Sequence, residues 1–147
     1  LQTVWACNEP QMTELTLPFL GQDSSENQYP FASLAAAGVP LAMGSDWPVS
    51  TANVFKQIEV AVTRRHPLHR DREPLHADQA LSLSQALIAF TAGSARVNGI
   101  EQETGTIAVG MVADLAIADR NPFAVAPIGE TRVTHTIKGG RVLYRQE

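Results

Sequence analysis

The stretch Val39-Pro40-Leu41-Ala42-Met43-Gly44-Ser45-Asp46 decides the fold class of this sequence. A short apolar run, Val39 to Met43, passes directly into the polar tripeptide that ends at Asp46. This pattern is typical of a buried parallel strand whose C-terminal end carries polar residues. Because α/β folds place ligand-binding and catalytic groups at such strand ends, the stretch predicts both a strand and a candidate site at Asp46.

Helical patterns lie on both sides of this predicted strand. Residues 30–37 are rich in good helix formers, and Gly38 stands where a helix C-cap is expected. Residues 53–65 carry apolar side chains at loosely helical spacing, and a charged, proline-containing loop, 66–74, follows them. Residues 1–6 form a second short apolar run that predicts a strand. The first part of the chain is therefore expected to be of the α/β type.

The middle of the chain is predicted to be helical. Ser82-Leu83-Ser84-Gln85 matches the capping box, in which a serine hydroxyl and a glutamine side chain satisfy free backbone donors. We expect a helix from Leu83 to about Ala92. A further short helix is expected to follow, with Ser94 as its N-cap and Gly99 as its C-cap.

The last third changes to β-type signals. Strands are predicted at residues 106–107, 113–118 and 133–138, separated by turns that contain glycine and proline. Gly139-Gly140 is expected to form a tight turn, so that residues 141–144 pair back on the preceding strand. A small antiparallel β unit is predicted to close the chain.

Composition excludes several classes of protein. The chain has 147 residues, enough for one ordinary domain, and a net charge of −4, which gives no electrostatic footprint for nucleic acid or an anionic membrane. The most apolar stretch, 31–43, is shorter than the roughly 20 residues of a membrane span.

The single Cys7 excludes an intramolecular disulfide, so a cytoplasmic location is the default expectation. Because Leu1 is not methionine and begins a strand-like run, we expect the sequence to come from the interior of a longer chain.

Asp46 is the candidate catalytic residue, since a carboxylate at a strand end can bind a metal ion or carry a proton. A plain alternative exists. Asp46 could cap the following turn, with Ser50 or Thr51 starting the next helix, and the Gly-Ser-Asp tripeptide alone favours this capping role.

The surrounding residues change that balance, because ordered motifs along most of the chain resemble one family. These motifs are Tyr29-Pro30-Phe31-x-Ser33-Leu34, Ala37-Gly38-Val39-Pro40-Leu41-Ala42-x-Gly44-Ser45-Asp46-Trp47-Pro48-Val49, Ala61-Val62-Thr63-Arg64-Arg65, Leu81-Ser82-Leu83-x-x-Ala86-Leu87-x-Ala89-Phe90-Thr91, Gly105-Thr106-Ile107-x-Val109-Gly110-Met111-Val112-Ala113-Asp114-Leu115 and Gly139-Gly140-Arg141-Val142. Together they resemble the amidohydrolase superfamily, in the branch of YtcJ-like and N-substituted formamide deformylase-like enzymes (amidohydrolase family 3). Each motif by itself is weak evidence for the family, whereas the ordered combination of all of them is specific.

The resemblance implies the C-terminal portion of a (β/α)8 TIM barrel over residues 1–100, followed over 101–147 by strands of a small composite β-sandwich domain. It implies that Asp46 ends the eighth barrel strand, contacts a divalent metal, zinc or iron, and carries the proton for a metal-activated water that hydrolyses a non-peptide C–N bond of an amide or formamide. Trp47 and Pro48 would then line the substrate pocket. Ordinary loop packing is an equal alternative for these two.

The other metal ligands that the family implies are absent from this sequence. Such enzymes use a His-x-His pair, an acidic or modified lysine residue and two later histidines, whereas this chain offers His66-Pro67-Leu68-His69 in a predicted loop. We expect His66, His69 and His76 to be loop histidines and His135 to be structural. Because catalytic sites typically use three protein ligands, Asp46 alone cannot hold the metal.

Two further residue types are expected to be structural. Cys7 follows an apolar run and resembles a small buried hydrophobe more than a nucleophile. Arg64-Arg65 could bind an anionic substrate, but a solvated helix end is favoured, because positive charge there suits the helix dipole.

These observations predict the C-terminal portion of a metal-dependent amidohydrolase with a small-molecule amide-type substrate, no nucleic-acid partner and no membrane partner. The strands of 101–147 would lack part of their sheet, so a homo-oligomer or association with a missing N-terminal part is expected. The alternative is a catalytically inactive, stand-alone α/β module that associates with itself or with another protein.

Overall fold

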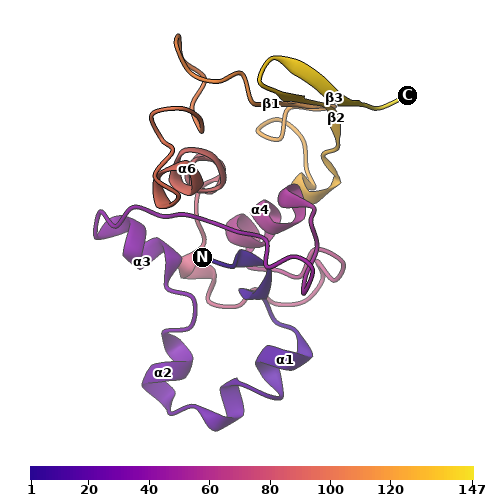
Figure 1. The fold of residues 1–147 in the computed structure, drawn as a ribbon. Coiled ribbons are helices and arrows are strands. Elements are labelled where there is room, and N and C mark those ends of the chain that lie inside the picture. Colours follow the sequence, from indigo (N-terminus) through magenta and orange to yellow (C-terminus); the bar gives the residue numbers. More distant parts are fainter.

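The computed structural model describes residues 1–147, and its first hundred residues are mainly short helical elements (Figure 1). Here α marks an α-helix and η a 3-10 helix, except that η4 is a π-helical turn. In chain order these are η1 (Thr3–Trp5), α1 (Pro10–Thr13), η2 (Leu17–Phe19), α2 (Gln22–Glu26), α3 (Phe31–Ala36), α4 (Val54–Thr63), η3 (Ala77–Gln79), α5 (Leu83–Ile88), η4 (Ala89–Gly93) and α6 (Ser94–Val97). The strands β1 (Leu115–Ala118), β2 (Val133–Lys138) and β3 (Arg141–Arg145) follow, with η5 (Ile128–Glu130) between β1 and β2. None of the helices has the length and apolar character needed to cross a bilayer.

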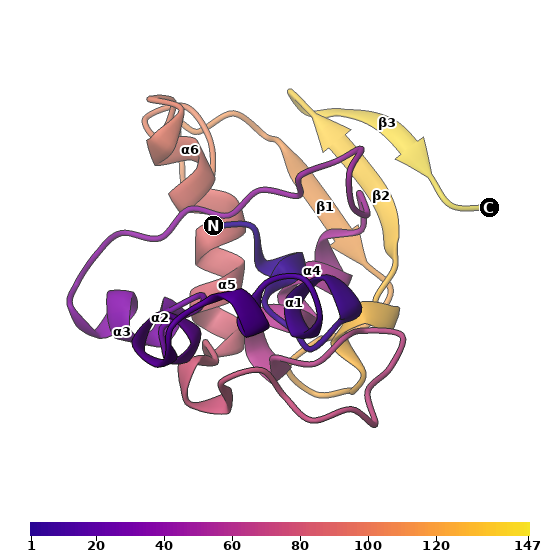
Figure 2. The same cartoon turned by 90° about the horizontal axis from the view of Figure 1, so that it is seen from below.

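Helix α4 lies at the centre of the molecule (Figures 1 and 2). The Asn53 side chain caps its first turn by accepting a hydrogen bond from the Lys56 N–H at 3.2 Å. The helix ends at Arg64, which adopts a left-handed conformation with φ 57°. The helix predicted over 53–65 is thus confirmed, and the helix predicted over 30–37 is confirmed by α3.

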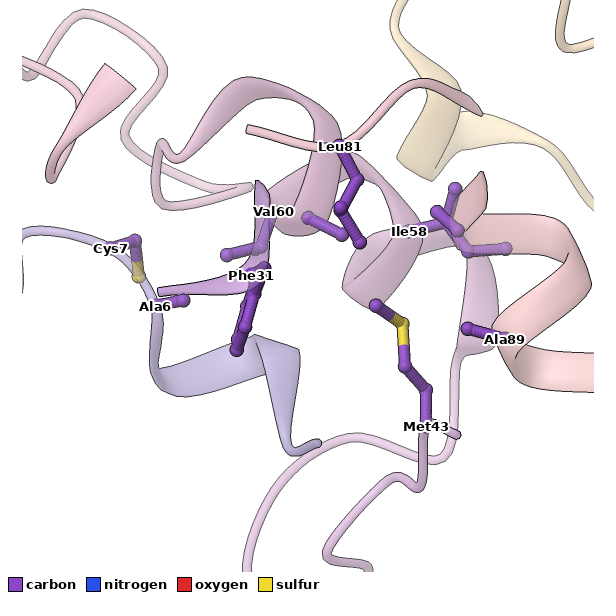
Figure 3. Close-up of a cluster of buried hydrophobic side chains, with 10 residues drawn as sticks. Ala6, Cys7, Phe31, Met43, Ile58, Val60, Leu81 and Ala89 are labelled. Atoms are coloured by element: carbon purple, nitrogen blue, oxygen red, sulfur yellow. The ribbon is translucent and has the colours of Figure 1, made fainter. Parts of the chain in front are cut away.

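The core forms around α4, as Figure 3 shows. Ile58, Val60 and Ala61 are buried on the helix, and Phe31 of α3 and Leu81 pack in the same cluster. The remaining members are Ala6, Cys7, Met43, Ala86 and Ala89. Since a fully buried large apolar side chain contributes roughly 1.5–3 kcal/mol, this cluster joins segments from the first ninety residues into one unit.

The predicted strand at residues 39–43 is extended but does not form a sheet. Its only backbone pairing with the N-terminal segment is at Leu1, whose amine donates to Ala42 O at 2.6 Å, while Gly44 N–H donates to Leu1 O at 3.0 Å. These two bonds have the pattern of a parallel bridge between Leu1 and Met43, because Leu1 donates to the residue before Met43 and accepts from the residue after it. The strand prediction is therefore wrong, because two hydrogen bonds to one residue do not make a ladder.

The strand predicted at residues 1–6 is also wrong. The chain turns into η1 after Leu1, with Ala6 N–H donating to Thr3 O at 3.0 Å. Thr3, Ala6 and Cys7 are all fully buried. The turn brings these three side chains inward together, which an extended strand with alternating faces would not do.

Residues 83–97 form one continuous helical run in which α5, η4 and α6 follow without a break. The predicted capping box is confirmed, because Ser82 Oγ accepts from Gln85 N–H and Ser82 N–H donates to Gln85 Oε1. The predicted N-cap at Ser94 is wrong. Ser94 lies inside the run, and its hydroxyl donates to Met43 O at 2.7 Å.

The η4 segment is a π-helical turn that packs directly on the extended segment 39–43. Met43 N–H donates to Ala89 O at 3.0 Å. A Cβ on Gly93 would lie only 2.1 Å from Leu41 O, so this close approach requires glycine. The loop that carries Asp46 is therefore anchored against the helical run.

The strands form an antiparallel sheet in the order β1-β2-β3. The Gly139-Gly140 turn between β2 and β3 is confirmed, with both glycines at positive φ. The strand predicted at 113–118 begins only at Leu115, and the one predicted at 106–107 is absent, since Ile107 lies in an irregular loop and is 88% exposed. A two-residue run with no neighbouring strand has nothing to pair with, so its β propensity has no effect.

Candidate functional site

Asp46 lies in the loop between the extended segment and α4. Its side chain is half-buried, and its backbone adopts a left-handed conformation with φ 55°. The indole Nε1–H of Trp5 donates to Asp46 Oδ2 at 3.1 Å. No other hydrogen bond reaches this carboxylate, so one oxygen is held and Oδ1 has no partner within the chain.

The backbone of the Asp46 loop is fixed by several hydrogen bonds. Val49 N–H and Ser50 N–H both donate to Asp46 O, at 2.8 and 3.1 Å. The Gln57 amide from α4 donates to Thr51 O at 2.6 Å, and the Ser50 hydroxyl donates to Ser45 O. Asn53, not Asp46, caps the following helix. The Asp46 carboxylate is thus free of the capping role that the tripeptide by itself favours.

Trp47 and Pro48 follow Asp46 on the outer side of the loop. The Trp47–Pro48 peptide bond is cis, and the Trp47 side chain is 65% exposed. No hydrogen bond of the indole N–H of Trp47 is present. The predicted contact of these residues with substrate stays a prediction.

None of the four histidines forms a hydrogen bond with Asp46. His66 and His69 face one another across the 66–74 loop with ring centroids 4.9 Å apart, and burial, followed by the neighbouring His69 and Arg72 charges, lowers the pKa of His66. His76 Nε2 is 2.8 Å from Ser25 O. His135 lies in β2, as predicted.

The chain's donor groups do not fit a complete catalytic metal site. No three side chains of histidine, cysteine, aspartate or glutamate come close enough together to hold a metal ion. A catalytic zinc typically takes three protein ligands, and Asp46 has no such neighbour. Asp46 could supply one oxygen ligand to an ion whose other ligands come from elsewhere.

Arg64 corrects the expectation of a solvated helix end, because its side chain is fully buried. Its guanidinium donates to the carbonyls of Leu75 at 2.7 Å, Tyr29 at 3.2 Å and Gln28 at 3.4 Å, and it lies 5.0 Å from the ring centre of Phe31. Burial lowers the pKa of Arg64 to about 10. These donors are used by the chain's own carbonyls, so Arg64 serves the fold and no anionic substrate.

Cys7 is fully buried, and its thiol donates to Val4 O at 3.5 Å. Burial and, secondarily, the Glu9 carboxylate raise the pKa of the Cys7 thiol to about 12. Since only the thiolate is a good nucleophile, this environment agrees with the structural role expected of Cys7.

An open groove of about 970 Å³ lies away from Asp46, between α4, the 83–97 helical run and one face of the sheet. Its walls include Phe55, Ile58, Leu87 and Phe90 on the helices and Leu115, Val133 and Tyr144 on the strands. Asp46 does not line it, so the groove and the candidate catalytic residue are separate features. At this groove, one face of the three-stranded sheet is partly uncovered.

Sequence patterns missed two residues at this site, Trp5 and Gln57. Trp5 lies 41 residues from Asp46 along the chain, and Gln57 is buried on α4 beneath the Asp46 loop. No local periodicity or motif signals such contacts, because they depend on how separate segments pack. Gln57 Oε1 is buried without a hydrogen-bond donor.

Comparison with known proteins agrees with this architecture. Residues 3–144 match the family model described as the amidohydrolase family. The YtcJ protein of Bacillus subtilis (strain 168) is 26% identical over 129 residues, which are 86% of this chain and 24% of that protein. The N-substituted formamide deformylase of Arthrobacter pascens is 30% identical over 120 residues, which are 80% of this chain and 22% of the enzyme.

A crystal structure of an amidohydrolase from Thermotoga maritima MSB8 has the same fold in its matching part. The TM-score is 0.60 at 20% identity, over 80% of this chain and 26% of that one. The fold and these matches together define a protein of the amidohydrolase type. The chain belongs to the amidohydrolase family, in the YtcJ-like branch of family 3. It spans about a quarter or less of the length of the curated relatives it matches.

Proposed function

We propose that this chain is the C-terminal portion of a metal-dependent amidohydrolase that hydrolyses a non-peptide C–N bond in a small amide or formamide. Asp46 is its catalytic residue and carries the proton. The observation that supports this role most strongly is the Asp46 carboxylate itself, which is held at Oδ2 by Trp5 and has no partner at Oδ1.

Asp46 combines two properties that a proton carrier needs. The fixed loop backbone and the Trp5 hydrogen bond restrict the position of the carboxylate. The free Oδ1 can accept a proton from an attacking water and return it to the leaving nitrogen. Trp47 and Pro48, which follow directly, are proposed to contact the substrate.

The metal belongs to the proposal only with ligands from outside this chain. A bound divalent ion, zinc or iron, would supply an acidified water and polarise the carbonyl. Asp46 would offer it one oxygen ligand, and the remaining ligands would come from the preceding barrel strands of the longer polypeptide.

We further propose that residues 1–100 belong to the (β/α)8 barrel and residues 101–147 to the composite β-sandwich domain. Two features support this division. The parallel bridge between Leu1 and Met43 is what two neighbouring barrel strands would form. The sheet has free edges at β1 and β3, and every residue of β3 is exposed, so additional strands of the sandwich have room to pair.

The decisive experiment assays the longest polypeptide that contains this chain, loaded with zinc or iron, on N-substituted formamides and simple amides. Asp46→Asn removes the proton-carrying oxygen and should lower kcat by about a hundredfold or more, because general acid–base catalysis contributes roughly 10²–10⁴-fold. Elemental analysis of the same preparations measures the metal content.

Asp23→Asn is the matched control, because Asp23 is exposed on α2 and its side chain makes no hydrogen bond in the chain. Its kcat should equal that of the unaltered protein. An Asp46→Asn enzyme with unchanged kcat would remove Asp46 from the mechanism. A polypeptide with no hydrolase activity and no bound metal would overturn the proposed function.

One observation favours a second, non-catalytic function. The chain has no complete ligand set for a metal, and it has an open apolar groove and two free sheet edges. The chain alone would then be an inactive module that associates with a second copy or another subunit. Light scattering of the 147-residue chain tests this second function: a dimer supports self-association, and a stable monomer at all concentrations contradicts it.

A further inference from the structure

We propose that Trp5 is a positioning residue for the catalytic Asp46: its indole N–H fixes Oδ2, so that proton transfer is confined to Oδ1. This inference rests on the proposed function. It adds a residue from a distant part of the chain, because the hydrogen bond joins positions 41 residues apart at 3.1 Å.

The backbone that carries Trp5 is held firmly. Two residues before it, Thr3 is fully buried, and its hydroxyl donates to Gln57 O of α4 at 3.1 Å. Immediately after it, Ala6 and Cys7 are fully buried in the core (Figure 3). Trp5 therefore reaches Asp46 from a rigid support, which is what precise placement of a catalytic group requires.

Asp46 needs such a support because its backbone is in the sparsely populated left-handed region, with φ 55°. Aspartate tolerates this conformation better than most residues. A residue with such a strained backbone persists where several contacts of the surrounding structure hold it in place. Helix α4 holds both the segment of Trp5 and the loop of Asp46 through one residue, Gln57. The Gln57 backbone carbonyl accepts from the Thr3 hydroxyl, and the Gln57 side-chain amide donates to Thr51 O.

Trp5 also suits the role chemically. An indole N–H is a donor only, so it can hold a carboxylate oxygen but cannot exchange a proton with it in the reaction. A hydroxyl or imidazole in the same place could donate and accept, and would offer the proton a second route. The indole thus makes the two oxygens of Asp46 unequal.

The first test observes the contact directly by NMR. The chain has two tryptophans, so ¹⁵N-labelled protein gives two indole N–H signals, and Trp47→Phe assigns them. In the Asp46→Ala variant the Trp5 signal should shift toward that of a free indole and exchange with solvent faster, while the exposed Trp47 signal stays near its place. An unchanged Trp5 signal would overturn the inference whatever the activity.

The second test measures kinetics in the metal-loaded, longest polypeptide. Trp5→Phe keeps an aromatic ring and removes the N–H. We expect kcat to fall about tenfold to a hundredfold, which is typical for loss of a group that orients a catalytic ligand, with KM nearly unchanged. A general structural defect would instead lower the folded fraction, which circular dichroism and thermal unfolding of the same samples measure.

The two proposals fail in different ways. If Asp46→Asn abolishes activity and Trp5→Phe keeps full kcat, Asp46 remains catalytic and the positioning role of Trp5 is wrong. If Asp46→Asn keeps full activity, the proposed function itself is wrong. A matched loss of kcat in both variants, together with the shifted indole signal, supports the positioning role.

Discussion

Gly129 N–H donates to Glu59 Oε2 at 2.5 Å, which joins the centre of helix α4 to the η5 turn 70 residues later. The approach is so close that a Cβ on Gly129 would lie 2.8 Å from the same oxygen. Arg70 completes the arrangement by donating to Glu59 Oε1 at 2.5 Å. One buried carboxylate therefore holds together α4, the 66–74 loop and the segment that leads into β2.

We expect Glu59→Gln to destabilise the protein by about 2 kcal/mol or more, because hydrogen bonds to a charged group contribute roughly 1.5–3 kcal/mol each and the Glu59 side chain is only 3% exposed. Urea unfolding measures this change. Glu130→Gln is the control, since Glu130 is 56% exposed and lies 3.7 Å from the same Arg70, and its loss should change stability by less than about 0.5 kcal/mol. Equal effects of the two substitutions would contradict the role of the buried carboxylate.

Arg64→Met should destabilise the protein by about 2–4 kcal/mol, because it keeps the bulk of the side chain and leaves buried carbonyls of Leu75, Tyr29 and Gln28 without their donor. Thermal unfolding gives the measurement. Arg96→Met, at an exposed position in α6, tests loss of positive charge alone and should cost only a few tenths of a kcal/mol. A mild Arg64→Met phenotype would mean that water can replace the guanidinium.

Ser82→Ala removes the hydroxyl that accepts from Gln85 N–H at 3.2 Å and should lower the free energy of unfolding by about 1 kcal/mol. Ser84→Ala tests the same chemical change two residues later, at an exposed helix position without a side-chain hydrogen bond. Alanine is the better helix former, so this control should be neutral or slightly stabilising. Chemical denaturation of both variants, compared side by side, decides whether the capping box matters.

The Cys7 thiol gives a pH dependence at the alkaline end. Burial raises its pKa in the folded protein to about 12, above the ordinary value of 9.0, so the folded state disfavours the thiolate and the unfolded state does not. The stability contributed by the neutral thiol is fully present below pH 9.0 and is lost as the pH rises from 9.0 toward about 12.

Cys7→Ala should reduce the slope of stability against pH in this alkaline range, as measured by urea unfolding at a series of pH values. A thiol reagent such as an aromatic disulfide should also react with Cys7 only after unfolding. Rapid modification of the native protein at neutral pH would show that the thiol is not protected.

Local sequence determined those features whose physical cause lies within a few residues. The capping box at Ser82 and Gln85 and the Gly139-Gly140 turn are fixed by hydrogen bonds and φ angles inside four or five residues, and the predictions at both places are confirmed. The predicted helix at 53–65 is likewise confirmed by α4, because its apolar spacing specifies a buried face. The ordered motifs along most of the chain also sufficed to identify the family.

Tertiary structure alone decided which extended segments became strands and what surrounds Asp46. Residues 1–6 and 39–43 have strand-like sequences, yet one bridge between Leu1 and Met43 is all the pairing they find, since a strand exists only with neighbours along its length. The contact between Trp5 and Asp46 likewise depends on packing against α4. Sequence determined that a carboxylate stands at position 46; the packing of distant segments determined which of its oxygens is held.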